Sequence, residues 1–335
     1  MKYSKNALNI LTIKSYNGIG NAWIVKNLKG NETVDEIVSL LNKSLKDGPT
    51  NVDEFEQLRN NFEARILDRF SECCDGLVAF GDSQFPRHRG IVKDSSRPVL
   101  LYYKGDIKLL SHENNNISVI GLLNPNDDIE NRERNIVAEF VKNGSTIVSG
   151  LAFGCDSISH IQALDSNGKT IAILPSPLNN IMPAKNKGLA FQIVEEGGLI
   201  VSEYGSDFKS SMELNSRYQE RDRLQALFCD TIVLAASYSK NSAERWKLYG
   251  QKLDSGARLA MGYASEFGIP RAVMYDQDMD EDNPMFDLNR DLIKEDKNVT
   301  ILTRYNFVES ITNILDKNEI EKNARNFEQG SFKFD

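Results

Sequence analysis

Short apolar runs rich in Val, Ile and Leu recur along the chain from about residue 76 onward. Amphipathic stretches separate them, and several of these stretches end at a glycine just before the next run, as at Gly144 and Gly268. Glycine accepts the left-handed backbone of a helix C-cap at little cost. This alternation is typical of βαβ units, and the low polarity of the runs indicates helices on both faces of a sheet. The predicted strands are 77–80, 99–103, 117–120, 146–148, 170–174, 199–201, 231–235, 272–275 and 299–302.

The first 75 residues have a helical pattern instead. Apolar positions recur at helical spacing over 34–41 and 55–70, and Thr33 with Glu36 predicts a capping box. We therefore predict an α/β fold: a doubly wound, mostly parallel sheet, preceded by a small all-α domain. The predicted domains are 1–75, 76–317 and a C-terminal tail over 318–335. We also expect an insertion or helical lid at 237–256 and an acidic loop at 276–282.

Charge is distributed unevenly along the chain. The formal net charge is −8, yet residues 76–275 hold 22 basic and 22 acidic side chains, whereas residues 276–335 hold 8 and 15. A neutral central stretch can still contain a local basic cleft. No apolar run reaches the roughly 18 residues that span a bilayer, and the four cysteines lack zinc-ligand spacing. We expect a cytoplasmic protein without a membrane span, a metal or a cofactor.

The segment from Ser149 to His160 is the strongest candidate site. A predicted strand runs into a Ser-Gly turn, and a helix begins soon after. In open α/β sheets, ligands bind beyond the carboxyl ends of the strands, where helix N-termini attract phosphate. A purely structural interpretation stays open: Gly150 and Gly154 permit a tight turn, and Asp156 caps the helix. We expect His160 to be a structural histidine rather than a catalyst.

Residues 149–160, SGLAFGCDSISH, resemble the Ser-Gly-Leu-Ala-x-Gly-Ile-Asp…His signature of the DNA-processing protein A family (DprA/Smf). The resemblance continues over roughly residues 80–275, through a Pro-x-x-Leu-x-x-Lys-Gly strand at 98–105 and a Gly…Ser-Glu segment at 198–203. It implies an extended Rossmann-like fold and non-catalytic binding of single-stranded DNA. It further implies a homodimer and the loading of a RecA-type recombinase in recombination and DNA uptake. Gly18-Ile19-Gly20 also resembles the turn of a helix-hairpin-helix, although a structural helix turn fits equally.

Some positions depart from the family pattern. The arginine that usually follows the first Rossmann glycine is replaced in Gly121-Leu122-Leu123-Asn124, and Asp222 stands where the family has asparagine between two arginines. No winged-helix pattern follows residue 280. These departures weaken the expectation of DNA binding more than that of the fold.

The resemblance and the spacing together give one set of candidate binding residues for phosphate, DNA or nucleotide. Exposed arginines often only solvate a helix, so the three arginines of this set have a structural alternative. The set is Gly121, Ser149, Gly150, Leu151, Gly154, Asp156, Lys185, Asn186, Glu203, Arg217, Arg221, Arg223, Ser255 and Gly256.

A second hypothesis is a nucleotide sensor or a nucleotide- or NAD-cleaving enzyme of the same superfamily, active in defence against phage. In that case Asp156 and Glu203 are the candidate acid and base. The Pro-Gly-Gly-x-Gly-Thr signature of the phosphoribohydrolases is absent, because the corresponding strand end reads Ala235-Ala236-Ser237-Tyr238. For stacking against bases we expect Phe153 and Tyr218.

Overall fold

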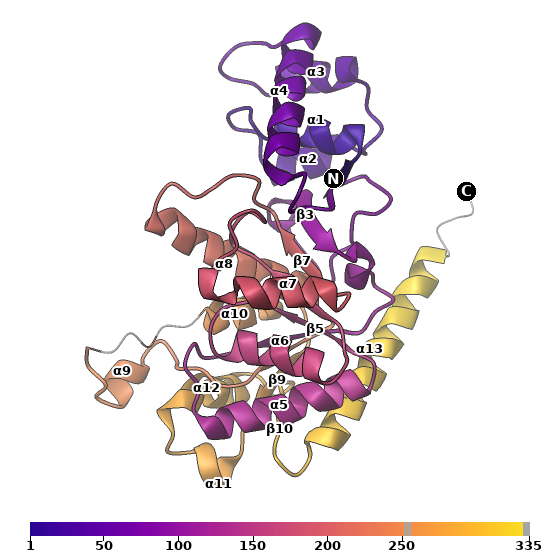
Figure 1. Cartoon of the computed structure of the whole chain (residues 1–335). Coiled ribbons are helices and arrows are strands. Elements are labelled where there is room, and N and C mark those ends of the chain that lie inside the picture. Colours follow the sequence, from indigo (N-terminus) through magenta and orange to yellow (C-terminus); the bar gives the residue numbers. More distant parts are fainter. Residues whose placement is uncertain (251–252, 254–255, 331–335) are drawn as a thin grey trace.

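A ten-stranded sheet forms the centre of the molecule in the computed structural model, which describes residues 1–250, 253 and 256–330 (Figure 1). The strand order is β1-β2-β3-β7-β6-β5-β4-β8-β9-β10. The strands are β1 (Lys2–Tyr3), β2 (Gly76–Ala79), β3 (Leu100–Gly105), β4 (Asn116–Ile120), β5 (Thr146–Ser149), β6 (Thr170–Ile173), β7 (Leu199–Ser202), β8 (Thr231–Leu234), β9 (Arg271–Met274) and β10 (Thr300–Leu302).

The sheet is mostly parallel, as predicted. The seven strands from β7 to β10 in this order all run parallel, and only β3 opposes its neighbours β2 and β7 within the described sheet. All nine predicted strands are confirmed. The sequence pattern missed β1, in which Lys2 and Tyr3 pair with the start of β2. The predicted all-α segment therefore also contributes an edge strand.

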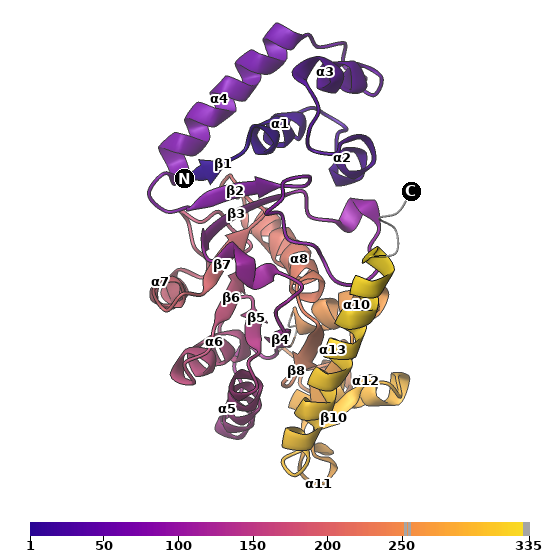
Figure 2. The ribbon, with the colours of Figure 1, turned by 90° about the vertical axis from the view of Figure 1, so that its right-hand side faces the viewer.

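Helices cover both faces of the parallel strands. Figure 2 shows α5, α6 and α7 on one face and α8 and α10 on the other. Gly144, Gly197 and Gly268 have positive φ where α5, α7 and α10 end, as expected for helix C-termini. These helices are α5 (Asp127–Lys142), α6 (Cys155–Asp165), α7 (Lys187–Glu195), α8 (Ser211–Leu227) and α10 (Ala257–Phe267); the short 3-10 turns are 94–96, 107–110, 184–186 and 284–286.

The N-terminal helices lie over the β1–β2–β3 edge of the sheet (Figure 2). Thr33 and Glu36 form the predicted capping box, with Glu36 N–H donating to Thr33 Oγ1 and Thr33 N–H donating to Glu36. The apolar side chains of the N-terminal helices, Phe55 and Phe70 among them, belong to one hydrophobic cluster with Leu100 of β3 and residues of α7. These helices are α1 (Lys5–Ile13), α2 (Asn21–Asn27), α3 (Val34–Asn42) and α4 (Val52–Phe70).

The C-terminal segments are more ordered than the sequence pattern indicates. Helix α13 (Phe307–Gly330) runs through the expected boundary at 317, and its Lys322 Nζ lies 3.4 Å from Asp230. The expected acidic loop at 276–282 contains the helix α11 (Gln277–Asp280), so that prediction is wrong in this part. Within 237–256, helix α9 (Ser242–Arg245) is tied to the start of α12 (Asp287–Glu295) by a 2.5 Å hydrogen bond from Ser242 to Asp287.

None of the helices in the described ranges is both long and apolar enough to cross a bilayer.

Candidate functional site

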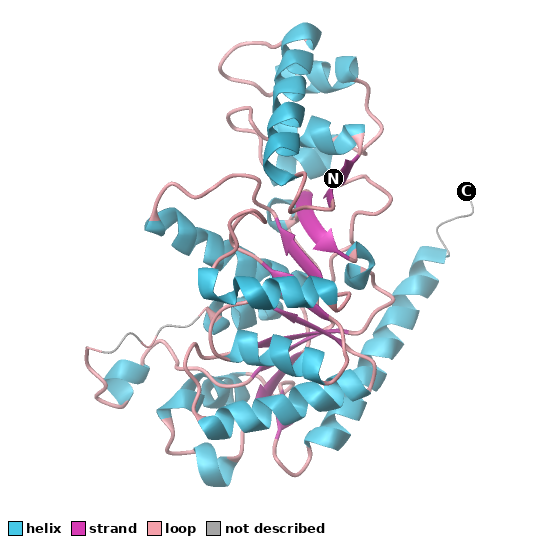
Figure 3. Cartoon of the chain, in the orientation of Figure 1, coloured by secondary structure: helices cyan, strands magenta, loops and turns pink. Residues whose placement is uncertain are grey.

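The chain reverses its winding direction at β4, which lies between β5 and β8. Beyond the carboxyl ends of these strands, Gly121 follows β4 and Gly150 follows β5. At Gly121 a Cβ would stand 2.6 Å from Cys155 Sγ, so only glycine lets the start of α6 approach the end of β4. The loops that follow the parallel strands gather at this edge of the sheet (Figure 3), which is where open α/β sheets bind ligands.

The turn between β5 and α6 is fixed by hydrogen bonds. Ser149 Oγ donates to the Val119 carbonyl of β4 at 2.7 Å, and Leu151 has φ 59°. Gly154, with φ 70°, is the N-cap residue of α6. The prediction that Asp156 caps this helix is therefore wrong.

Asp156 has a different role in the same turn. It lies in the first turn of α6 and accepts hydrogen bonds from the N–H groups of Gly150 at 3.1 Å and Ala152 at 3.3 Å. A carboxylate at this position also benefits from the positive end of the helix dipole. Asp156 thus occupies backbone amides that we expected, from the Ser-Gly motif, to bind a phosphate.

Arg221 of α8 occupies the space above Gly150. A Cβ on Gly150 would stand 1.1 Å from Arg221 Nη1, so the guanidinium fills the place of the missing side chain. Arg221 Nη1 lies 3.5 Å from Asp156 and its Nε lies 3.4 Å from Asp222. The structure brings these predicted residues together, but Arg221 is only 4 % exposed.

The other two candidate arginines are also turned inward. Arg223 makes two hydrogen bonds to Glu203, of 2.9 and 2.8 Å, and one to the Ser96 carbonyl. Arg217 donates to the Ser206 carbonyl at 2.7 Å and lies over the Tyr204 ring. Both side chains are buried and pair within the protein, so neither is an exposed arginine that only solvates its helix.

The remaining candidates lie around the same edge. Asn186 donates to the Leu151 carbonyl at 2.8 Å and to Ser157 Oγ at 2.9 Å, which ties the start of α7 to the β5–α6 turn. Lys185 beside it is exposed. Gly256 precedes α10, and a Cβ there would stand 2.7 Å from Asp222 Oδ2. Ser255 lies outside the described residues.

The sequence predicted only some of the exposed cations and aromatic rings at this edge: it indicated Phe153 but not Phe191, Lys187 or Lys209. Phe153, in the turn after β5, is 42 % exposed as expected for a stacking residue, and Phe191 of α7 is 43 % exposed. Lys187 lies 5.6 Å from the Phe191 ring, and Lys209 is exposed in the loop that precedes α8. The positions of Lys187 and Lys209 could have been predicted, because both residues come soon after a predicted strand and so lie toward the carboxyl ends of the parallel strands.

Two buried titratable groups lie behind the turn: Glu133 between α5 and α6, and His160 between α6 and β6. Burial lowers the pKa of His160 to about 3, and its Nδ1 lies 2.6 Å from Thr170 Oγ1. Burial raises the pKa of Glu133 to about 8, while Ser159 Oγ donates to its carboxyl at 2.7 Å. His160 is therefore a neutral, buried histidine where α6 packs on β6.

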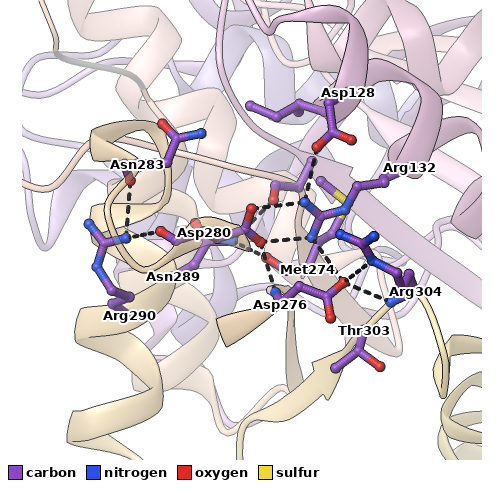
Figure 4. Close-up of polar contacts among 12 residues, drawn as sticks. Asp128, Arg132, Met274, Asp276, Asp280, Asn283, Asn289, Arg290, Thr303 and Arg304 are labelled. Carbon is purple, nitrogen blue, oxygen red and sulfur yellow. Dashed lines mark hydrogen bonds and ion pairs between the residues drawn. The ribbon is translucent and has the colours of Figure 1, made fainter. Parts of the chain in front are cut away.

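A second polar cluster joins α5 to the ends of β9 and β10 (Figure 4). Arg132 makes two hydrogen bonds to Asp280, of 2.9 and 2.8 Å, and Asp280 accepts from the N–H of Asp276 at 2.8 Å. Arg304 donates to Asp276 at 3.3 Å. Two residues of the expected acidic loop, Asp276 and Asp280, are thus buried and paired with arginines. Among the residues that the structure describes, no three His, Cys, Asp or Glu side chains gather as metal ligands.

The sequence of this chain is similar to those of known DNA-processing proteins. The model of the family described as DNA recombination-mediator protein A matches residues 76–243. Protein Smf of Borreliella burgdorferi is 28% identical over 255 residues, which cover 75% of this chain and 73% of that protein. DNA processing protein DprA of Streptococcus pneumoniae is 28% identical over 235 residues, covering 68% and 77%.

Two solved structures share the fold. DprA from Streptococcus pneumoniae aligns with a TM-score of 0.65 at 22% identity, over 92% of this chain and 98% of that one. DprA from Helicobacter pylori, in a structure described as showing its single-stranded DNA binding mode, aligns with a TM-score of 0.56 at 25% identity, over 72% and 96%. With the family model matching half of its residues, the chain belongs to the DNA recombination-mediator protein A family, which includes DprA and Smf.

Proposed function

We propose that this protein binds single-stranded DNA at the carboxyl edge of its parallel strands and acts in DNA processing without catalysing a reaction itself. The observation that carries the proposal is the match to DprA from Helicobacter pylori, for which a single-stranded DNA binding mode is described. Family membership favours this function over the nucleotide-cleaving alternative, whose candidate residues Asp156 and Glu203 are engaged with backbone amides and with Arg223.

The exposed lysines at the edge are the expected phosphate contacts. Arg217, Arg221 and Arg223 are paired inside the protein, whereas Lys185 and Lys187 project from the connection between β6 and α7. Lysine is a point charge that suits backbone contacts, which position DNA without reading its sequence. Bases would stack on nearby aromatic rings such as Phe153, and stacking is tolerant of sequence.

The test is a titration of fluorescently labelled oligo-dT by anisotropy over a series of salt concentrations. We expect Lys185→Ala combined with Lys187→Ala to weaken binding and to reduce the slope of log affinity against log salt by about 0.7 for each phosphate that the variant leaves without its lysine. Lys142→Ala is the matched control, because Lys142 ends α5 at the opposite edge of the sheet. The proposal fails if the wild-type protein does not bind at low salt, or if the double variant and the control behave alike.

The wider role rests on the same family membership. We propose that the protein acts in the cytoplasm as a homodimer and helps to load a RecA-type recombinase onto single-stranded DNA. The four thiols Cys73, Cys74, Cys155 and Cys229 are unbridged, which suits a reducing compartment. Light scattering of the purified chain and strand-exchange assays with a recombinase would test the dimer and the loading separately.

A further inference from the structure

The charge of the Arg221 guanidinium is shared between two carboxylates. Asp156 lies 3.5 Å from Nη1 and Asp222 lies 3.4 Å from Nε. Asp156, Arg221 and Asp222 are all less than a tenth exposed. Counting ionised groups, this trio has one positive and two negative charges, directly above the Gly150 backbone.

The two carboxylates differ in what else they hold. Asp156 accepts hydrogen bonds from the amides of Gly150 and Ala152, so the turn needs it. Asp222 has no such backbone task among the described residues. Its Oδ1 faces Arg221 Nε and accepts a hydrogen bond from the Gln225 amide at 3.2 Å. Its Oδ2 faces the start of α10, where the absence of a side chain at Gly256 makes room for it. The second negative charge therefore makes no direct bond to the backbone of the turn.

Resting on the proposed function, we propose that Asp222 determines the affinity of this edge for DNA phosphates. Asp222 and Asp156 both pair with Arg221. Together they keep the guanidinium over Gly150, and their charges offset the positive charge that an incoming anion would otherwise meet. A phosphate that approaches the amide-bearing turn meets a cluster that is negative overall. When Asp222 is neutral, Arg221 balances Asp156 alone and the repulsion disappears.

The surroundings of Asp222 make this contribution sensitive to pH. Burial raises the pKa of Asp222 to about 7, with the Asp156 charge adding to the rise and Arg221 opposing it. From α10, Tyr263 interacts with Asp222, and the charges that also act on Tyr263 are Arg223 and Glu220 of α8 and Glu266 of its own helix. Glu133 of α5 lies behind Asp156 and titrates nearby, so the informative quantity is the difference between two proteins rather than one profile.

The experiment measures anisotropy of labelled oligo-dT from about pH 6 to pH 8.5 for wild type, Asp222→Asn and Asp165→Asn. Asparagine keeps the shape and removes the charge. Asp165→Asn removes one charge from the exposed end of α6 and controls for net charge alone. We expect Asp222→Asn to bind the oligo-dT about tenfold more tightly than wild type at the alkaline end and to match wild type at the acidic end. Asp165→Asn should change the affinity by less than about twofold at either end.

A second readout separates this inference from the proposed function. Thermal melting of the same proteins with and without inorganic phosphate reports anion binding directly, and melting without phosphate shows that Asp222→Asn folds. If neither protein binds DNA but phosphate stabilises Asp222→Asn more than wild type, the DNA function fails while the role of Asp222 stands. If the folded Asp222→Asn variant gains nothing over wild type in DNA binding and in phosphate stabilisation, the proposal is overturned.

Discussion

Glu133 makes the stability of the protein depend on pH in a way that one substitution should remove. The side chain is buried between α5 and α6, and burial raises its pKa from 4.5 to about 8. Below about pH 4.5 both the folded and the unfolded chain hold the proton. Between 4.5 and 8 the unfolded chain releases it while the folded chain keeps it, so the free energy of unfolding falls as pH rises.

The size of the effect follows from the shift. At 1.36 kcal/mol for each pH unit, a rise from 4.5 to about 8 corresponds to a loss on the order of 5 kcal/mol across the window. Glu133→Gln should lack this loss, because glutamine mimics the protonated acid and its amide oxygen can still accept from Ser159 Oγ. The variant should match wild type near pH 5 and exceed it by several kcal/mol above about pH 8.

Urea unfolding followed by tryptophan fluorescence at several pH values gives the required free energies. Other groups titrate in the same range, so the difference between variant and wild type is the relevant quantity. Glu139→Gln on the same helix, where the largely buried Glu139 pairs with the exposed Lys142, controls for the loss of a carboxylate that has a cationic partner. A difference between Glu133→Gln and wild type that stays constant from pH 5 to pH 8.5 would refute the reasoning.

Three further predictions concern stability and use the same unfolding assay. Gly150→Ala should lower the free energy of unfolding by more than about 2 kcal/mol, because the new methyl group would stand 1.1 Å from the Arg221 guanidinium. Gly188→Ala, in open space on α7, should be neutral or stabilising, and equal effects of the two substitutions would contradict this reasoning. Arg132→Leu should cost about 3–5 kcal/mol because the buried Asp280 loses its partner, and a loss under about 1 kcal/mol would argue against the pairing. His160→Gln should flatten the fall in stability between pH 6.5 and about 3, since burial depresses the histidine pKa, and an unchanged acid limb would exclude that cause.

The alternation of apolar runs and glycine-terminated helices was enough to predict the sheet. Parallel strands are buried on both faces, so their sequences are continuous apolar runs that stand out from the polar connections, as at 146–149 and 231–234. Strand β1 gave no such signal, because two residues have no periodicity. It exists through pairing with β2, more than seventy residues away. Helix α11 is equally invisible in a local pattern, since Asp280 folds back onto the N–H of Asp276 while Arg132 of a distant helix pairs with it.

The sequence indicated that several candidate residues would lie at one edge of the sheet, but it did not indicate the direction of their side chains. Arg221 does meet the Ser-Gly turn after β5, because topology places the ends of parallel strands together. The sequence could not show that Arg223 reaches Glu203 and the Ser96 carbonyl, since those partners are 20 and 127 positions away. Whether an arginine faces solvent or a buried carboxylate depends on such distant partners, which helical spacing does not reveal.

These internal pairs also change how the charge count bears on DNA binding. Residues 76–275 contain equal numbers of acidic and basic side chains, but several arginines there, including Arg89 with Asp230 and Arg223 with Glu203, are paired in the interior. A buried pair presents no net charge to DNA, and burial protects it from screening by salt. The attraction must then come from exposed lysines, whose interactions with phosphate weaken as salt rises. The affinity for single strands should therefore fall steeply with salt, although the neutral sum over the segment gives no hint of it.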